Sequence, residues 1–236
     1  MIEAHSLAKY FGRFAALRDL ELTVPKGELV AIFGRNGAGK TTLLRILAGL
    51  TRPTRGSVTI HNPSPQSPQS ARGIIGYLSH NTSIYTDLTA LENLRFYAKL
   101  FDLPGGDKEL EAQIQTVGLS GREHDLVRYY SRGMQQRLAI ARSFLHNPSI
   151  LLLDEPFTGL DQPGTDFLKK YLFAARALGK TCIMAIHDTA LGHELSDRLV
   201  VIEKGAVALD VERQSVSLGD FQRRYRALAE EPGDAR

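Results

Sequence analysis

The stretch from Gly34 to Thr42 has the residue types and the spacing that bind a chain of phosphates. It matches the pattern G-x-x-x-x-G-K-[ST] and lies between a predicted strand and a predicted helix. The glycines let the backbone curl so that several N–H groups face one anion, and the helix N-terminus adds partial positive charge. Lys40 would reach the outer phosphates, and the Thr41 hydroxyl could ligate Mg²⁺. The predicted nucleotide-binding residues of this stretch are Gly34, Arg35, Asn36, Gly37, Ala38, Gly39, Lys40, Thr41 and Thr42.

Two carboxylates follow an apolar run further along the chain. Residues 150–153 read Ile-Leu-Leu-Leu and lead into Asp154 and Glu155. The acids should therefore stand at the C-terminal end of a parallel strand, where open α/β sheets bind their ligands. Asp154 would hold Mg²⁺ through water, and Glu155 would accept a proton from an attacking water. Together with the phosphate loop, this pair indicates a P-loop NTPase.

The elements that must position these residues alternate between short apolar runs and helical patterns. Buried strands are expected at residues 29–33, 150–153 and 182–186, and amphipathic helices over residues 134–145 and 167–175. This alternation predicts an α/β fold, a P-loop NTPase core with a mostly parallel sheet. The first strands, near residues 2–8 and 20–24, are linked by a short basic and aromatic segment. We expect them to form an antiparallel β subdomain beside the main sheet.

An inserted α-helical subdomain is expected between two strands of the core, because residues 87–128 are mainly helical in pattern. Thr89 and Glu92 form a capping-box pattern that opens a helix over residues 90–100. A second helix follows and ends near Val117. This lobe would interrupt the strand and helix alternation of the core.

Composition adds only broad restrictions. The 236 residues carry a net charge of +3, and a lone cysteine, Cys182, excludes an internal disulfide and a cysteine-rich metal site. No apolar run approaches the ~20 residues of a membrane span, and the N-terminus has no signal-peptide pattern, so we expect a cytoplasmic protein. Residues 61–70 are interpreted as an exposed loop without chemistry, and residues 221–229 as a helix with a solvated basic face.

Residues 130–137 narrow the class of enzyme. They read Tyr-Ser-Arg-Gly-Met-Gln-Gln-Arg, open a predicted amphipathic helix, and resemble the signature motif of ABC ATPases, commonly Leu-Ser-Gly-Gly-Gln followed by Gln-Arg. In that family the serine hydroxyl and nearby N–H groups bind the γ-phosphate held by the other subunit. The resemblance implies this role for Ser131 and Gly133. The departures from the common pattern are Tyr130, Arg132 and Met134.

Further residues match the same family in the same order along the chain. Asp161 resembles the loop residue that crosses to the partner subunit, and it is also a candidate helix N-cap. His187 follows the strand at residues 182–186 and resembles the switch histidine that senses the γ-phosphate. Phe11 resembles the aromatic residue that stacks on adenine, with Tyr10 as an alternative and core packing as the other interpretation.

His80 stands where the family usually has a glutamine that bridges the Mg²⁺ site and the helical lobe. The family pattern Leu-Thr-Ala-Leu-Glu-Asn-Leu resumes downstream at residues 88–94, which fixes the alignment. Imidazole can donate or accept a hydrogen bond, and it titrates near neutral pH. We hypothesise that His80 replaces the glutamine as sensor, near both the nucleotide and the metal.

The resemblance covers roughly residues 2–210 and implies one ABC ATPase domain over residues 1–236. The helical subdomain would span about 87–146 and a C-terminal tail about 211–236. It further implies ATP and Mg²⁺ as ligands, with Glu155, His187 and Lys40 as the catalytic residues. The partners would be an identical or homologous ATPase and a separate transmembrane permease, with no nucleic acid. The chain would then sit peripherally on the inner face of the cell membrane.

Two alternatives stay open: a soluble ABC ATPase that acts on DNA or ribosomes, and a P-loop kinase for a small molecule. The first usually carries two cassettes or a long coiled-coil insertion, and the second needs no signature helix. Among transporters, the short tail favours export. Residues 88–94 and 154–158 have a weaker likeness to the ATPase of the haem exporter of cytochrome c maturation.

Overall fold

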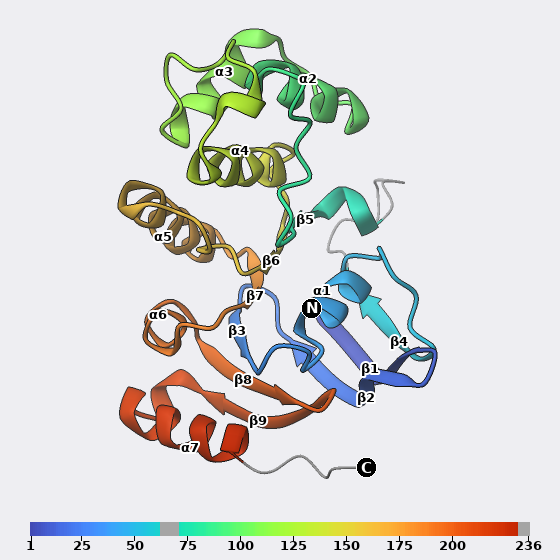
Figure 1. The fold of residues 1–236 in the computed structure, drawn as a ribbon. Helices are drawn as coiled ribbons and strands as arrows, with labels where there is room; N and C mark the ends of the chain where they lie inside the picture. Colours follow the sequence, from blue (N-terminus) through green and yellow to red (C-terminus); the bar gives the residue numbers. More distant parts are fainter. Residues whose placement is uncertain (62–70, 231–236) are drawn as a thin grey trace.

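The computed structural model describes residues 1–61 and 71–230, and Figure 1 shows how its elements are arranged. The loop predicted at residues 61–70 therefore lies outside the described residues except for His61, which is exposed. The strands are β1 (Ile2–Phe11), β2 (Phe14–Val24), β3 (Leu29–Phe33), β4 (Arg55–Ile60), β5 (Ile75–Leu78), β6 (Ile150–Asp154), β7 (Thr181–Ala185), β8 (Arg198–Glu203) and β9 (Ala206–Glu212). The α-helices are α1 (Lys40–Leu47), α2 (Ala90–Leu100), α3 (Asp107–Thr116), α4 (Arg132–Phe144), α5 (Gln162–Ala177), α6 (Thr189–Leu195) and α7 (Leu218–Glu230).

The main sheet has the strand order β5-β6-β7-β3-β8-β9. The strands from β5 to β8 in this order are parallel to their neighbours, and β9 runs antiparallel to β8. Every residue of β3, β6 and β7 is buried, because the sheet is covered on both faces. The predicted α/β class with a mostly parallel sheet is confirmed.

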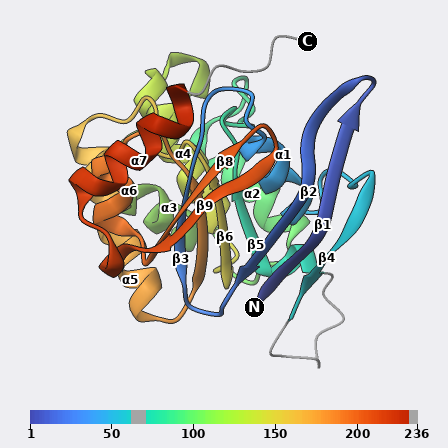
Figure 2. The same ribbon diagram turned by 90° about the horizontal axis from the view of Figure 1, so that it is seen from below.

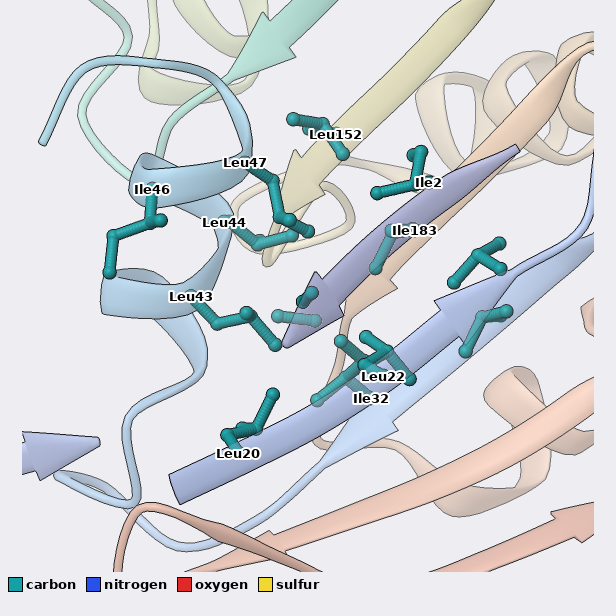
Figure 3. Packing of buried hydrophobic residues seen from close by; sticks show 14 of the residues in the cluster. Ile2, Leu20, Leu22, Ile32, Leu43, Leu44, Ile46, Leu47, Leu152 and Ile183 are labelled. Carbon is teal, nitrogen blue, oxygen red and sulfur yellow. The ribbon is translucent and has the colours of Figure 1, made fainter. Parts of the chain in front are cut away.

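One hydrophobic cluster joins the main sheet to α1 and to the antiparallel sheet. Figure 3 shows leucines of α1, among them Leu44 and Leu47, together with Ile2 of β1, Leu152 of β6 and Ile183 of β7. Each leucine buried in this way contributes about 1.5–3 kcal/mol relative to an exposed one. The packing therefore fixes the helix that follows the phosphate loop against the sheet that carries the loop.

The expected antiparallel sheet is present and has the order β2-β1-β4. The strand β4 was not predicted, and β1 and β2 are longer than predicted. The basic and aromatic segment between residues 9 and 19 is mostly strand, and the two strands are joined by a tight turn at Gly12 and Arg13. The prediction of a non-strand linker was wrong because bulges break the alternation of apolar and polar residues. Ser6 and Asp19, at such irregular positions, have φ of 46° and 48°.

The helical elements between β5 and β6 share a hydrophobic cluster of their own, built mainly from α2, α3 and α4. The predicted helix over residues 90–100 is confirmed with its capping box, in which Thr89 and Glu92 exchange hydrogen bonds. The apolar face expected for α4 lies in this cluster through Leu138 and Ala141. However, Ile140 and other residues of α4 belong to the main core, so the helix is buried on two sides. The domain boundaries stay a prediction.

The end of the described chain packs back onto the main sheet. α7 lies beside α6 in both views of the fold (Figures 1 and 2). Phe221 is fully buried, with its ring 4.9 Å from that of Phe33, while Arg223, Arg224 and Arg226 are exposed. The predicted helix is confirmed, and its basic face is exposed in the single chain. Across the described residues, no helix has the length and hydropathy needed to cross a bilayer.

Candidate nucleotide site

The phosphate loop runs from the end of β3 to the start of α1, whose first residue is Lys40. Gly39, directly before the helix, has a φ of 112°, and a Cβ there would lie 2.5 Å from the carbonyl oxygen of Ala16. Glycine is therefore the residue that fits this position. Residues 35–42 all line one pocket, so the loop backbone and the helix N-terminus face the same space, as an anion site requires.

Lys40 is held at the mouth of the loop although it is only 6% exposed. Its ammonium donates to the carbonyl oxygens of Gly34, at 2.6 Å, and Arg35, at 3.2 Å. Burial lowers its pKa, while the carboxylates of Glu155 and Asp154 act in the opposite direction. An ammonium has three donors, so one more proton can be donated to an anion in the pocket.

Asp154 ends β6 and fits the role of a magnesium ligand. The Thr41 hydroxyl donates to its Oδ1 at 3.1 Å, whereas its Oδ2 is buried and has no hydrogen-bond partner among the described residues. Burial is the main cause that raises the pKa of this carboxyl. A hard cation held by oxygen ligands would satisfy the unpaired oxygen. His80 also borders this space, but imidazole is a softer ligand than Mg²⁺ prefers.

Glu155 follows Asp154 and is turned out of the strand by an unusual backbone conformation. Its φ is 52°, in the left-handed region that costs a non-glycine residue free energy, and its N–H is held by the carbonyl of Ala185. The turn brings its Oε1 to 2.7 Å from Nε2 of His187 and its Oε2 to 3.5 Å from Nδ1 of His80. The Glu155 carboxylate therefore lies between two imidazoles at the C-terminal ends of the parallel strands.

Except for Asp154, these groups line a single cavity of about 740 Å³. Among the predicted residues it brings together Phe11, residues 35–42, His80, Glu155 and His187. Asp154 lines a neighbouring hollow that shares Thr41 and His80 with this cavity. Phe11 is 54% exposed on this cavity, whereas Tyr10 lies on a different hollow, so Phe11 remains the candidate adenine contact.

Sequence reasoning missed Phe14, which also lines the cavity and pairs with Phe11 across the β1–β2 turn. It also missed Asn81. Phe14 directly follows the Gly12-Arg13 turn, so in a hairpin it lies opposite Phe11. Assigning this segment to two strands would have predicted that Phe14 lies beside Phe11.

Ser131, Gly133 and Asp161 form a second cluster, and within residues 1–61 and 71–230 none of them lines this cavity. The Ser131 hydroxyl accepts from the N–H of Met134 at 3.2 Å and caps α4. Asp161 caps α5 by accepting from the N–H of Gly164 at 3.0 Å. A Cβ on Gly133 would lie 3.1 Å from the carbonyl oxygen of Gly159, so the two helix starts approach closely. The predicted N-cap at Asp161 is confirmed.

Comparison with known proteins gives one consistent family. The family model described as ABC transporter matches residues 17–158. An uncharacterised ABC transporter ATP-binding protein of Bacillus subtilis, YdbJ, is 36% identical over 91% of this chain and 70% of its own length. A fluoroquinolones export ATP-binding protein of Mycobacterium tuberculosis is 38% identical over 83% of this chain and 65% of its own. A sulfate/thiosulfate import ATP-binding protein of Rhizobium meliloti, CysA 1, is 36% identical over 87% and 61% respectively.

A solved structure agrees with these matches. The ATP-binding cassette MJ0796, in a dimeric post-hydrolysis state bound to ADP and Pi, is 27% identical to this chain with a TM-score of 0.79. The similarity covers 90% of this chain and 99% of that one.

Proposed function

Because the chain belongs to the ABC transporter family, as an ATP-binding subunit with ATPase activity, we propose that two such chains close around ATP and drive transport. Transport would pass through a separate transmembrane permease. The second chain would be an identical copy or a homologous ATPase. ATP-binding cassettes of this family form dimers, as in MJ0796.

One observation carries the dimer proposal. The cavity that holds the phosphate loop, Glu155 and His187 lacks Ser131 and Gly133 of the same chain. Those two residues stand at the N-terminus of α4, which is a second place in the chain where N–H groups can meet a phosphate. If protein groups contact the γ-phosphate of ATP from both sides, the groups on the second side must belong to another chain. Asp161 would cross at the same interface.

Each residue of the cavity has a role in this proposal. Lys40 and the loop N–H groups bind the β- and γ-phosphates, and Phe11 stacks on the adenine. Glu155 accepts the proton of the attacking water, and His187, 2.7 Å from its carboxylate, orients that carboxylate and contacts the γ-phosphate. Thr41 and Asp154 would hold Mg²⁺, which would supply positive charge against the charge of the phosphates.

The membrane partner sets the location and the cargo. We propose that the chain lies peripherally on the inner face of the cell membrane through its permease. Export is supported by the relative named for fluoroquinolones export, although a relative named for sulfate and thiosulfate import matches at 36%. Haem is the first cargo to test, because of the weaker sequence likeness to the haem exporter ATPase.

The test is phosphate release by the purified chain without any acceptor molecule, measured across protein concentrations. Specific activity should rise with protein concentration, because an active site forms only when two chains meet. A small-molecule kinase would release little phosphate without its acceptor. Constant specific activity down to concentrations at which the chain is monomeric would contradict the proposal.

Direction and cargo need the permease. We would identify the membrane protein that co-purifies with the tagged chain and reconstitute both in vesicles with ATP on the side of this chain. Accumulation of cargo in the opposite compartment would confirm export, and loss from it would establish import.

A further inference from the structure

A second hollow, of about 560 Å³, lies on the antiparallel sheet. Arg13 and Arg18 from the β1–β2 hairpin line it, together with Arg55 at the start of β4. Among the described residues, the linings of this hollow and of the nucleotide cavity do not overlap: Phe11 lines the nucleotide cavity and its neighbour Tyr10 lines the hollow. The two sites are neighbours, because Arg18 also lines a third, smaller hollow together with residues 35–38 of the phosphate loop.

The three arginines gather here without partners. Within residues 1–61 and 71–230, none of their guanidinium groups takes part in a hydrogen bond or an ion pair, in contrast to Arg95, which pairs with Asp107. Asp19 also lines the hollow, so three cations against one carboxylate leave an excess of two positive charges. Like charges gathered in one place repel each other, and an anion in the hollow would remove that repulsion.

The choice of arginine indicates which anion fits. A guanidinium is always charged, and its planar fork can donate two parallel hydrogen bonds to a phosphate group. Three forks around one hollow can bind more than one phosphate. Tyr10 lines the same hollow with 42% of its surface exposed, which offers a face to a planar ring.

The backbone holds this shape at some cost. Ser6 and Asp19 both line the hollow, and both have positive φ, at 46° and 48°. Such conformations cost a non-glycine residue on the order of 1–3 kcal/mol. Glu21 keeps Ser6 in place by accepting from its N–H, at 2.6 Å, and from its hydroxyl, at 3.0 Å. The register shifts at these residues open the hollow in an otherwise regular sheet.

The charges further along the same strands favour a discrete ligand over an anionic bilayer. Glu3 and Glu21 are partly or largely exposed there, with side-chain exposures of 25% and 60%. Hydrogen bonds lower the pKa of both carboxyls, from His61 for Glu3 and from Ser6 for Glu21, so both stay ionised near neutral pH. A broad anionic surface laid on this sheet would meet these carboxylates, whereas a small molecule in the hollow would not.

We propose that this hollow binds a small soluble ligand that carries at least two phosphate groups and a planar ring, separately from the ATP that is hydrolysed. Arg13, Arg18 and Arg55 bind the phosphates, and Tyr10 stacks on the ring. The site is independent of the roles given to the nucleotide cavity.

The test uses tripolyphosphate as the probe and isothermal titration calorimetry as the measurement. The full-length chain carries Lys40→Ala in all arms, so that the phosphate loop contributes little to binding. We expect one equivalent of probe to bind, and Arg55→Glu to weaken the Kd at least ~10-fold, since a cation of the site becomes an anion. Arg226→Glu is the matched control, because Arg226 is exposed on α7 and the net charge changes equally; it should change the Kd less than ~2-fold, because exposed charges at a distance are screened by salt.

Two results would overturn the proposal. One is binding that Arg55→Glu leaves unchanged, or no binding to the Lys40→Ala chain at millimolar probe. The other is flotation with phosphatidylglycerol vesicles that Arg55→Glu abolishes while tripolyphosphate fails to bind, which would make the hollow a membrane contact. Arg13→Glu, in the turn between β1 and β2, replaces Arg55→Glu if that variant melts earlier than the control.

Discussion

The nucleotide cavity and the start of α4 hold their polar groups in different ways. In the cavity, the important side chains point at one another across a shared space, as Glu155 does to His187 at 2.7 Å. At the start of α4, Ser131 points to its own helix and accepts from the N–H of Met134. The cavity groups come from the ends of fully buried strands, whereas the α4 groups stand on a partly exposed surface.

This difference shows which reacting groups a single chain brings together by itself. The cavity has a candidate base, a cation and a metal ligand in place before any partner arrives. Ser131 and Gly133 have their helix geometry in place but, in the described part of the chain, do not line the nucleotide cavity. A change in the cavity should therefore act on the same ATP, and a change at α4 should act on an ATP bound by another chain.

The largest effect is expected from Glu155→Gln. The amide cannot accept the proton of the attacking water, so we expect hydrolysis to fall on the order of 10²–10⁴-fold. ATP binding should persist, because the phosphate loop is untouched, and the chain should accumulate as a closed dimer in size-exclusion chromatography with ATP. Phosphate release and elution volume measure the two effects.

A matched control is Glu194→Gln, at a surface carboxylate that pairs with Lys169. It makes the same chemical change away from both regions and should leave hydrolysis unchanged. If Glu155→Gln hydrolysed ATP at the normal rate, the cavity would not contain the base assigned to it.

The second prediction tests directly whether the two regions serve different nucleotides. Lys40→Ala and Ser131→Ala should each abolish most hydrolysis alone. Mixed in equal amounts, they should recover roughly a quarter of normal activity, because about half of the dimers are mixed and each mixed dimer has one intact site. The mixture would stay inactive if Ser131 gripped the ATP of its own chain, because then no chain would be complete.

Loss of the helix cap complicates Ser131→Ala, since an N-cap contributes about 1 kcal/mol to stability. Thr89→Ala removes a comparable cap from α2, where Thr89 accepts from the N–H of Glu92. This control should lower the melting temperature to a similar extent without abolishing hydrolysis. A similar loss of activity in both variants would mean that Ser131 acts through stability alone.

The sequence predicted the cavity better than it predicted the surfaces around it. The phosphate loop and the acids of β6 follow from local patterns, because an apolar run fixes a buried strand and its end fixes the next side chains. The helix over residues 90–100 was equally local, since its capping box lies within the sequence itself. These features need no knowledge of what packs against them.

Long-range packing was not predictable in the same way. The approach of Gly133 to Gly159 joins two helix starts that are distant in sequence, and no local pattern encodes that contact. The bulges at Ser6 and Asp19 interrupt the alternation of apolar and polar residues along β1 and β2. The sequence pattern therefore did not place Phe14 in a strand, and its position in the nucleotide cavity was not predicted. The second buried side of α4 depends on where the main sheet lies, so the spacing of apolar residues along the helix could not predict it.

A smaller effect on hydrolysis is expected from substitutions of His80, which lines both the nucleotide cavity and the hollow beside Asp154. Its Nδ1 lies 3.5 Å from Oε2 of Glu155, and its side chain is 52% exposed. A glutamine amide can donate to the same carboxylate and alanine cannot, so His80→Ala should hydrolyse ATP ~2- to 10-fold more slowly than His80→Gln. His124→Ala, an exposed histidine of the helical lobe, is the control. Equal, normal rates in both His80 variants would remove His80 from the site.

The smallest effect is expected at Tyr130, where a substitution tests whether the start of α4 contributes to stability or to hydrolysis. Tyr130 precedes Ser131, is 6% exposed, and donates its hydroxyl to the carbonyl of Arg122 at 2.6 Å. Burial raises the pKa of Tyr130 to about 12, so the hydroxyl remains a donor throughout the neutral range. Tyr130→Phe should cost about 1 kcal/mol, and the melting temperature should fall by about 2–4 °C. Hydrolysis well below that temperature should be unchanged.

Tyr129→Phe makes the same change at the neighbouring residue, which is 73% exposed, and should alter neither quantity. If Tyr130→Phe instead lowered hydrolysis as far as Ser131→Ala while the melting temperature stayed constant, the hydroxyl would belong to the chemistry. The α4 start would then hold a reactive group buried in its own chain, and its contrast with the nucleotide cavity would fail. If the loss is confined to stability, the Tyr130 hydroxyl holds the start of α4 in place and takes no part in hydrolysis.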